Sequence, residues 1–281
     1  MALGLIAKKV KKKRMINMEK DIRPDKWALV TGSSSGIGRE IVKLLESYGY
    51  GSILVARRRS RLEDLVEDLK YKSYIVEADL SQPSTAKDLC QKVDQLEEKE
   101  AIRIDLLVNN AGFGDLGFFG DTDLDKELDM IHVNIESLHI LMKHYLKRFV
   151  EEDRGHILNV ASSAGLMPAG PYMSTYYATK AYVTSLTSGV AKELKDRGSR
   201  VVVSALCPGP VDTEFNDVAN CSFDIGSIGP GQCAREALEN LFKKKTIIVP
   251  STKMKLATKF SKILTRNRLI DICGRQQKKK I

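Results

Sequence analysis

The sequence predicts a single α/β domain built on a doubly wound parallel sheet of about seven strands, with helices on both faces. Short apolar runs alternate with longer amphipathic stretches along most of the chain. Runs that are apolar throughout and bounded by Gly, Asn or Asp are typical of strands buried on both faces. With 281 residues, 43% of them hydrophobic and 29% charged, the chain is long enough for one sizeable core and has the composition of a folded protein.

The expected strands and helices alternate. The seven apolar runs lie at residues 27–31, 52–56, 73–77, 104–108, 156–160, 201–206 and 246–249. The helical patterns between them lie at about 37–48, 60–70, 83–99, 122–150, 174–197 and 231–244. This alternation implies parallel strands joined by right-handed helical crossovers. The segment 209–229 has no clear periodicity, so we expect a loop that acts as a lid over a site, although plain surface irregularity would give the same pattern.

Basic residues gather at the two ends of the chain. Residues 1–26 hold nine Lys or Arg against three Asp or Glu, and residues 253–281 hold ten against one, so the body between them is mildly acidic although the net charge is +9. We expect residues 1–26 to be a flexible basic leader, 27–250 to form the domain, and 251–281 to form a basic amphipathic helix, over 254–272, with a tail. Short terminal lysine runs are most often solvated, so we expect no nucleic-acid partner.

The composition also argues against several other classes of protein. The five cysteines are scattered, without a Cys-x-x-Cys motif or a histidine at metal-ligand spacing, which indicates reduced thiols and no metal site. The apolar start of the chain precedes its charges, the reverse of a secretory signal, and is too short for a membrane span. We therefore expect a cytoplasmic protein without a membrane segment.

A glycine-rich turn joins the first expected strand to the first expected helix. The segment 31–38 reads T-G-S-S-S-G-I-G. Glycines let such a turn close and let the backbone approach a pyrophosphate, while free N–H groups at the helix start attract its negative charge. Any tight turn favours Gly, so the motif is informative through its place after the strand. The residues expected to contact a dinucleotide here are Gly32, Ser34, Ser35, Gly36, Ile37 and Gly38.

Three arginines, at 57–59, follow the second expected strand. In an NAD-binding protein this place holds Asp or Glu for the adenosine ribose hydroxyls. A carboxylate would repel a 2′-phosphate, whereas guanidinium groups bind it through paired hydrogen bonds. The cofactor is therefore expected to be NADP(H), held first by Arg57 and next by Arg58, although arginines at a loop can also simply meet solvent.

The central set of polar residues is Ser163, followed thirteen residues later by Tyr176, with Lys180 four residues beyond. On a helix, the side chains of Tyr176 and Lys180 lie one turn apart on the same face. A phenol with a pKa of about 10 is a poor base at neutral pH, but a neighbouring ammonium stabilises the phenolate. Tyr176 is thereby expected to exchange a proton with a substrate oxygen. Tyr177 is a weaker candidate because its partner four residues on is the uncharged Ala181.

These motifs, in this order over about residues 27–215, resemble the short-chain dehydrogenase/reductase family. T-G-x-x-x-G-x-G at 31–38, N-N-A-G at 109–112 and the Ser-Tyr-Lys set match the signatures of that family. The resemblance implies a Rossmann fold and an NADP(H)-dependent oxidoreductase that interconverts a small-molecule ketone and a secondary alcohol. The stretch G-P-Y-M-S-T-Y-Y-A-T-K further resembles a bacterial subgroup of ketone and hydroxy-compound reductases, a label too broad to name a substrate.

The resemblance also implies roles for further residues. Ser163, rather than the adjacent Ser162, would hydrogen-bond the reacting oxygen. Asn134 needs a partner, because burying an unbonded amide costs about 1–3 kcal/mol, and it would lead through a water to Lys180 as a proton relay. A homodimer or homotetramer would assemble through the helices at 122–150 and 174–197. The other expected cofactor contacts are Asp79 and Leu80 at the adenine, Asn110, Ala111 and Gly112 as structural support, Tyr176 and Lys180, and Pro208, Gly209, Val211 and Thr213 at the nicotinamide amide.

Two other functions remain open from the sequence. A hydroxysteroid dehydrogenase would need a broad apolar pocket, which Leu166, Met167, Tyr172, Phe215 and the lid allow without selecting it. A dinucleotide-binding protein without catalysis would use the basic ends of the chain instead, and the intact Ser-Tyr-Lys set counts against that reading.

Overall fold

The computed structural model describes residues 22–219, 227–261 and 263–279. At its centre is a parallel sheet of seven strands in the order β3-β2-β1-β4-β5-β6-β7, which confirms the doubly wound Rossmann sheet expected from the sequence. The strand order reverses between β1 and β4, and ligands of such sheets bind at this point, outside the carboxyl ends of the strands. The strands are β1 (Lys26–Thr31), β2 (Tyr50–Ala56), β3 (Tyr74–Glu77), β4 (Ile104–Asn109), β5 (His156–Val160), β6 (Val202–Leu206) and β7 (Ile247–Ile248).

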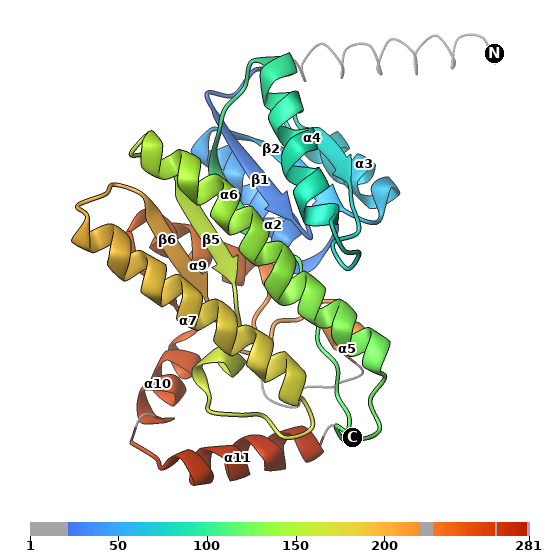
Figure 1. The fold of residues 1–281 in the computed structure, drawn as a ribbon, viewed down its shortest axis with the longest axis vertical. Helices are drawn as coiled ribbons and strands as arrows, with labels where there is room; N and C mark the ends of the chain where they lie inside the picture. Colours follow the sequence, from blue (N-terminus) through green and yellow to red (C-terminus); the bar gives the residue numbers. More distant parts are fainter. Residues whose placement is uncertain (1–21, 220–226, 262, 280–281) are drawn as a thin grey trace, which may run out of the picture.

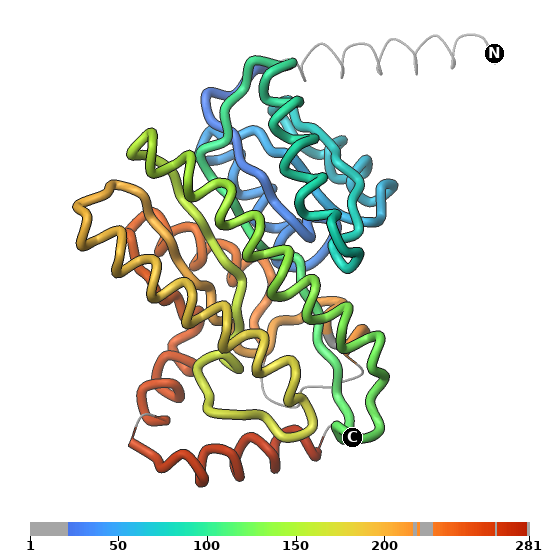
Figure 2. The backbone as a smooth tube through the Cα atoms, viewed as in Figure 1, coloured from blue at the N-terminus to red at the C-terminus, as the bar shows by residue number. Residues whose placement is uncertain are grey.

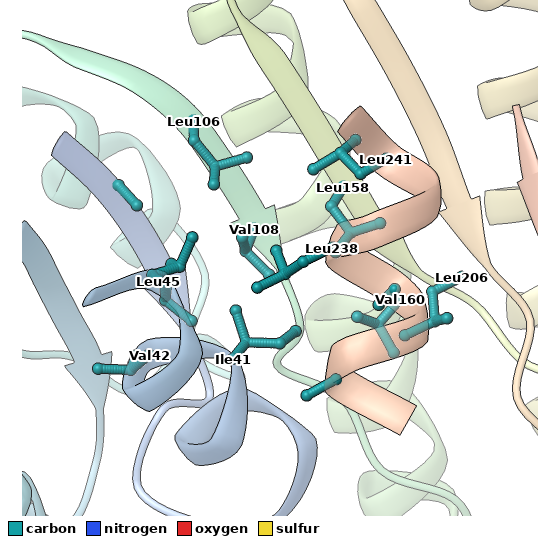
Figure 3. Packing of buried hydrophobic residues seen from close by; sticks show 14 of the residues in the cluster. Ile41, Val42, Leu45, Leu106, Val108, Leu158, Val160, Leu206, Leu238 and Leu241 are labelled. Carbon is teal, nitrogen blue, oxygen red and sulfur yellow. The ribbon is translucent and has the colours of Figure 1, made fainter. Parts of the chain in front are cut away.

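Helices α2 (Gly36–Leu45), α3 (Arg59–Asp68) and α9 (Pro230–Phe242) cover one face of the sheet. Figure 3 shows the centre of this layer, where apolar side chains of α2 and α9 meet those of β4, β5 and β6. Val108 and Leu158 are fully buried there. The strands need apolar side chains in both directions because helices also cover their other face, which explains why the sequence shows unbroken apolar runs.

Helix α4 (Thr85–Glu100), a long helical stretch between residues 124 and 151, and α7 (Ser174–Asp196) cover the second face. Figure 1 shows α4, α6 and α7 on the near side of the sheet, with α2 and α9 behind it. Tyr145 and Phe149 are fully buried in this second layer. The two layers hold the sheet in place, and its carboxyl edge, where the loops gather, stays available for a site.

The long helix expected over 122–150 contains an irregular turn. It consists of α5 (Leu124–Ile131), the π-helical segment η2 (His132–Ser137) and α6 (Leu138–Glu151). A π-helical turn accommodates one extra residue and is frequent at functional sites. The wider turn contains Asn134, whose amide is buried and bonded to neighbouring segments. Helical periodicity in the sequence does not reveal this insertion.

The C-terminal segment forms two helices, α10 (Thr252–Ser261) and α11 (Arg266–Lys278), so the single helix expected over 254–272 is wrong. Thr265 has an extended backbone at the start of α11 and separates the two. The buried positions are Thr258 and Ser261 on α10 and Cys273 and Gln277 on α11, not the apolar stripe that predicted one helix. The apolar residues keep a helical spacing in the sequence even across the turn between α10 and α11, so the spacing does not reveal where one helix ends and the next begins.

The two C-terminal helices lie beyond the carboxyl ends of the strands. Figure 2 shows this segment, in red, running below the N-terminal end of α7. A Cβ atom added to Gly209, in the loop after β6, would lie 2.8 Å from the Met254 side chain of α10. Gln277 of α11 hydrogen-bonds Tyr177 of α7. The C-terminal segment therefore closes over the edge of the sheet where a ligand is expected.

Part of the expected lid over 209–229 lies outside the described residues, as does most of the expected leader over 1–26. In the described part of this segment, the chain forms the short helix α8 (Phe215–Val218), and Val211 pairs with Ile228 as a parallel bridge. Across the ranges that the structure describes, no helix combines the length and the apolar character needed to cross a bilayer.

Candidate active site

A cavity of about 910 Å³ lies at the carboxyl edge of the sheet, where the strand order reverses. Its walls bring together nearly all of the residues expected to act in catalysis or to bind the cofactor. Of these, Gly38 and Asn134 do not line the cavity. The residues that do so are Gly32, Ser34, Ser35, Gly36, Ile37, Arg57, Arg58, Asp79, Leu80, Asn110, Ala111, Gly112, Ser163, Tyr176, Lys180, Pro208, Gly209, Val211 and Thr213.

The glycine turn between β1 and α2 forms one wall of the cavity. Gly36 has a φ of 55°, in the left-handed region where a side chain is strained. Ser35, at the start of α2, makes no side-chain capping bond, which leaves the first N–H groups of the helix to a ligand. A Cβ atom at Gly38 would lie 2.4 Å from Asn110 Nδ2. Gly38 therefore has a packing role beneath the turn, and its expected contact with a ligand stays a prediction.

Asn110 and Thr31 fasten the end of β4 to the glycine turn. Thr31 Oγ1 accepts hydrogen bonds from the backbone N–H groups of Asn110 and Ala111, each at 3.0 Å. Asn110 Nδ2 donates to Thr31 O at 2.9 Å and to Gly32 O at 3.0 Å. These bonds join the two strands at which the order reverses, so they hold the turn in one position.

Arg58 is held at the rim of the cavity by three side chains. Its Nη2 donates to Ser34 Oγ at 3.3 Å, to Ser35 Oγ at 3.1 Å and to Glu214 Oε2 at 2.9 Å. Arg61 bonds the other carboxylate oxygen of Glu214. Arg61 and Arg58 hold the pKa of Glu214 below its ordinary value. Glu214 thereby ties the loop after β6 to the arginines after β2, a contact that sequence reasoning missed because nothing local marks it.

Arg57 extends further into solvent than Arg58. Its side chain is 68% exposed, and its Nη1 lies 4.0 Å from Asp79 Oδ2. Asp79 also accepts hydrogen bonds from the backbone N–H of Ser81 at 3.1 Å and from its hydroxyl at 2.9 Å. Both arginines line the cavity, so two guanidinium groups are available at this end of it.

Tyr176 and Lys180 lie one turn apart on α7, and both line the cavity. Lys180 Nζ donates to Val160 O at 2.9 Å and lies 5.8 Å from the centre of the Tyr176 ring. Burial of Lys180, which is 4% exposed, lowers its pKa from 10.5 to about 8. At neutral pH the ammonium form therefore still predominates, and its charge acts on the phenol across a region with little water to screen it.

The two adjacent serines have different environments. Ser162 Oγ accepts a hydrogen bond from Ala164 N at 3.1 Å and so caps the short 3-10 turn η3 (Ser163–Leu166). Ser163 is anchored by its own N–H, which donates to Pro208 O at 2.7 Å. The Ser163 hydroxyl has no hydrogen-bond partner among the described residues. This arrangement favours Ser163 over Ser162 as the donor to a ligand in the cavity.

The C-terminal helix engages Tyr177, the rival of Tyr176. Gln277 Nε2 on α11 donates to Tyr177 Oη at 2.8 Å. Burial raises the pKa of Tyr177 above its ordinary value. A phenol whose hydroxyl is bonded in this way and whose pKa is raised is a poor proton donor, so the geometry favours Tyr176.

Asn134 is fixed by three hydrogen bonds in η2. Its Nδ2 donates to Phe113 O at 2.9 Å and to Thr179 Oγ1 at 3.0 Å, while its Oδ1 accepts from Phe113 N at 3.1 Å. A Cβ atom at Gly112 would lie 2.8 Å from Asn134 Oδ1 and 3.2 Å from Lys180 Nζ, so both side chains lie behind Gly112. Most of the hydrogen-bonding capacity of Asn134 serves the fold, and the relay to Lys180 stays a prediction.

The C-terminal helices supply a wall of the cavity that the sequence did not assign to the site. Met254, Phe260 and Ile272 all line it. The sequence indicated only that this segment was amphipathic, which is equally typical of a helix packed on the body. Its apolar stripe was the one available signal, and the stripe does not say which surface it meets.

The apolar pocket considered for a steroid is only partly present as expected. Met167 and Phe215 line the cavity, whereas Leu166 and Tyr172 do not.

Within the described part of the chain, no group of three or more His, Cys, Asp or Glu side chains is placed to hold a metal ion.

Comparisons with known proteins agree with this geometry. Residues 26–221 match the family described as short chain dehydrogenase. The chain is 33% identical over 192 residues to an uncharacterized oxidoreductase from Bacillus subtilis, with 68% of this chain and 70% of the relative covered. It is similar to the structure of a short-chain dehydrogenase from Sphingobium yanoikuyae in complex with NADPH, at 28% identity and a TM-score of 0.75, with 85% of this chain and 92% of that chain covered. A 7β-hydroxysteroid dehydrogenase is similar at 25% identity and a TM-score of 0.76, with 89% and 97% covered.

Proposed function

The chain belongs to the short-chain dehydrogenase family, and on that basis we propose that it is an NADP(H)-dependent oxidoreductase that interconverts a ketone and a secondary alcohol. One observation carries the proposal: Tyr176 and the buried ammonium of Lys180 lie one turn apart on α7 and both border the cavity. A phenol beside a buried positive charge is suited to proton exchange at neutral pH.

The chain's own residues divide the work at the reacting oxygen. In the reductive direction, Tyr176 donates its phenolic proton to the substrate oxygen as negative charge develops there. Lys180 stabilises the phenolate that remains, and each pKa unit by which it lowers the pKa of the phenol corresponds to about 1.4 kcal/mol. Ser163 donates a hydrogen bond to the same oxygen. The nicotinamide cofactor, when bound, supplies the hydride in this direction and accepts it in the reverse.

The residues around the cavity fit NADP(H). The left-handed turn at Gly36 and the uncapped start of α2 suit a pyrophosphate. Arg57 and Arg58 suit a 2′-phosphate, because guanidinium groups bind phosphate through paired hydrogen bonds. Among the described residues, the carboxylates that line the cavity are Asp79 and Glu214. Asp79 pairs with Arg57 and Glu214 with Arg58, so neither is free to select the ribose hydroxyls of NAD(H).

The proposal is tested by measuring oxidation of NADPH and NADH with a panel of ketones, diketones and oxo-steroids. Tyr176→Phe is expected to lower kcat by at least about a hundredfold, because it removes the proton donor. The affinity of this variant for NADPH is expected to stay close to that of the wild type, because the rest of the cavity wall is intact.

Tyr182→Phe is the matched control. Tyr182 lies on the same helix but outside the cavity, where its hydroxyl bonds His139 Nδ1 at 2.7 Å on the exposed surface. This variant should turn over substrate as the wild type does. Loss of turnover in Tyr177→Phe, together with retention in Tyr176→Phe, would show that the assignment of the acid is wrong.

A further inference from the structure

Large apolar side chains remain exposed on the outer walls of the cavity. Val218 is 47% exposed, Phe260 65%, Leu264 39% and Ile272 38%, and all four line the cavity. They come from α8, from α10 and the turn that follows it, and from α11. Exposed apolar surface gathered around a cavity is typical of a site for an apolar ligand.

This apolar wall begins beside the reacting tyrosine. The ring centre of Phe215 lies 5.4 Å from that of Tyr176. A Cβ atom at Gly114 would lie 2.9 Å from Phe215, 3.1 Å from Tyr176 and 3.4 Å from Met173, so these three side chains meet around one point. A carbonyl group at Tyr176 thus has apolar neighbours. Tyr176 and Met173 also belong to one buried apolar cluster with Cys273 of α11, which connects this region to the C-terminal helices.

The C-terminal wall has a defined position against the body. Gln277 of α11 is bonded to Tyr177 of α7 at 2.8 Å. A Cβ atom at Gly274, one turn earlier, would lie 3.2 Å from Pro171, so α11 approaches the loop before α7 closely. Helix α11 thus contacts the rest of the protein at Tyr177 and at Pro171, and these two contacts fix the position of Ile272, which lines the cavity.

The same segment carries positive charge into the cavity wall. Lys253 on α10 and Lys279 at the end of α11 both line the cavity. Neither has a carboxylate partner within the residues that the structure describes, whereas Lys255 pairs with Glu236 at 3.1 Å. The described carboxylates that line the cavity, Asp79 and Glu214, pair instead with Arg57 and Arg58. Uncompensated ammonium groups beside an apolar wall suit a ligand that is apolar with an anionic end.

We propose that the substrate is an amphiphilic ketone or alcohol, with a long or bulky apolar body that packs on α10 and α11 and an anionic group that reaches Lys253 or Lys279. The inference rests on the proposed function, because it requires the carbonyl to lie at Tyr176. A long acyl chain and a fused-ring skeleton share this chemistry. The C-terminal segment formed by α10 and α11, all of which lies beyond the family match at 26–221, thereby selects the substrate.

The test compares kcat/KM, with NADPH, for five ketones: a mid-chain oxo-octadecanoate, an oxo-steroid carboxylate, the methyl ester of each, and cyclohexanone. At least one amphiphile is expected to exceed cyclohexanone by about tenfold or more, because it buries the exposed apolar wall. The carboxylate is expected to exceed its own methyl ester by about threefold, the size expected for a partly exposed ion pair. Which skeleton is preferred separates a chain from a ring system.

Variants assign these preferences to the C-terminal wall. Phe260→Ser should lower the preference for the amphiphile over cyclohexanone about fivefold. The double change Lys253→Gln and Lys279→Gln should abolish the preference for carboxylate over ester. Ile263→Ser and Lys259→Gln are the matched controls, because these side chains are exposed on the same segment but do not line the cavity, and both preferences should be unchanged in them.

The outcomes separate this inference from the proposed function. Reduction of cyclohexanone without preference for either amphiphile would overturn the inference and leave the proposed function standing. A preference that survives both the Phe260 and the lysine changes would also overturn it, since the ligand would then bind elsewhere. If NADPH binds but none of the wider panel of ketones is reduced, the proposed function fails and the inference fails with it.

Discussion

Glu214 Oε2 accepts a hydrogen bond from Arg58 Nη2 at 2.9 Å, and Arg61 bonds the same carboxylate. A carboxylate from the loop after β6 therefore already engages the guanidinium group proposed to bind the 2′-phosphate of NADPH. The phosphate and Glu214 compete for Arg58, while NADH, which lacks this phosphate, does not enter that competition. Glu214 is thus placed to modulate the choice of cofactor.

Glu214→Gln is expected to tighten NADPH binding by about threefold, the magnitude of an exposed ion pair, and to change NADH binding less. The measurement is the Kd of each cofactor by fluorescence titration at low salt. Glu63→Gln serves as control, because Glu63 pairs with Arg59 at 2.8 Å outside the cavity. An equal effect on both cofactors would contradict competition with the phosphate.

Arg57→Ala and Arg58→Ala should each weaken NADPH binding by about tenfold, because each removes a charged hydrogen-bond donor to phosphate. NADH binding should change much less. Arg59→Ala removes the same charge one position further on, where the side chain does not line the cavity, and should leave the ratio of the two Kd values unchanged. If all three variants weaken NADPH alike, the effect is general electrostatic attraction and not recognition of the 2′-phosphate.

Gly38→Ala is expected to lower the free energy of unfolding by about 1–3 kcal/mol through overpacking, and to weaken cofactor binding. The added Cβ would lie 2.4 Å from Asn110 Nδ2 and 2.5 Å from Gly32 O, so the glycine turn must shift. Urea unfolding measures the loss. Gly189→Ala is the control: nothing lies within 4 Å of a Cβ there, and in a helix interior this change should stabilise by about 0.5–1 kcal/mol.

The rate of ketone reduction should fall above about pH 8. Burial lowers the pKa of Lys180 to about 8, so its ammonium charge is present below that pH and is lost above it. Without that charge, the phenolate left on Tyr176 after proton donation is less stable. The measurement is kcat/KM for ketone reduction with NADPH between pH 6 and 10, at about ten pH values. The Kd of NADPH, measured over the same pH range, shows whether the fall in kcat/KM comes from catalysis or from weaker cofactor binding. A kcat/KM that does not change with pH would contradict the proposed role of Lys180.

The sequence predicted the residues that depend on local spacing. Tyr176 and Lys180 share a helix face whatever the rest of the fold does, because four residues make about one turn. The apolar runs were correctly placed as strands because short apolar runs bounded by Gly, Asn or Asp are typical of a sheet covered on both faces. The glycine turn and the arginines after β2 were found in the same way, each by its position after an apolar run.

Local spacing misled at the C-terminus. A helical stripe over 254–272 is continuous in the sequence, yet the chain turns at Thr265 and buries Thr258, Ser261 and Cys273 in place of the stripe. Periodicity reports which residues share a face, not which face meets the body. For the same reason the sequence did not predict that the C-terminal helices line the cavity, because an exposed residue such as Phe260 is compatible with a solvated helix as well as with a binding site.

The sequence by itself determined the family, the parallel sheet and the Tyr176–Lys180 pair, since each follows from residue types at short spacing. Only the tertiary structure decided which groups flank them. Glu214 and Arg58 are hydrogen-bonded although they lie 156 positions apart in the sequence, and Gln277 and Tyr177 are hydrogen-bonded although they lie 100 positions apart. Such contacts form only when the whole chain packs, because the position of each group then depends on every element between them. The cavity wall that we propose to select the substrate likewise could be recognised only in the tertiary structure.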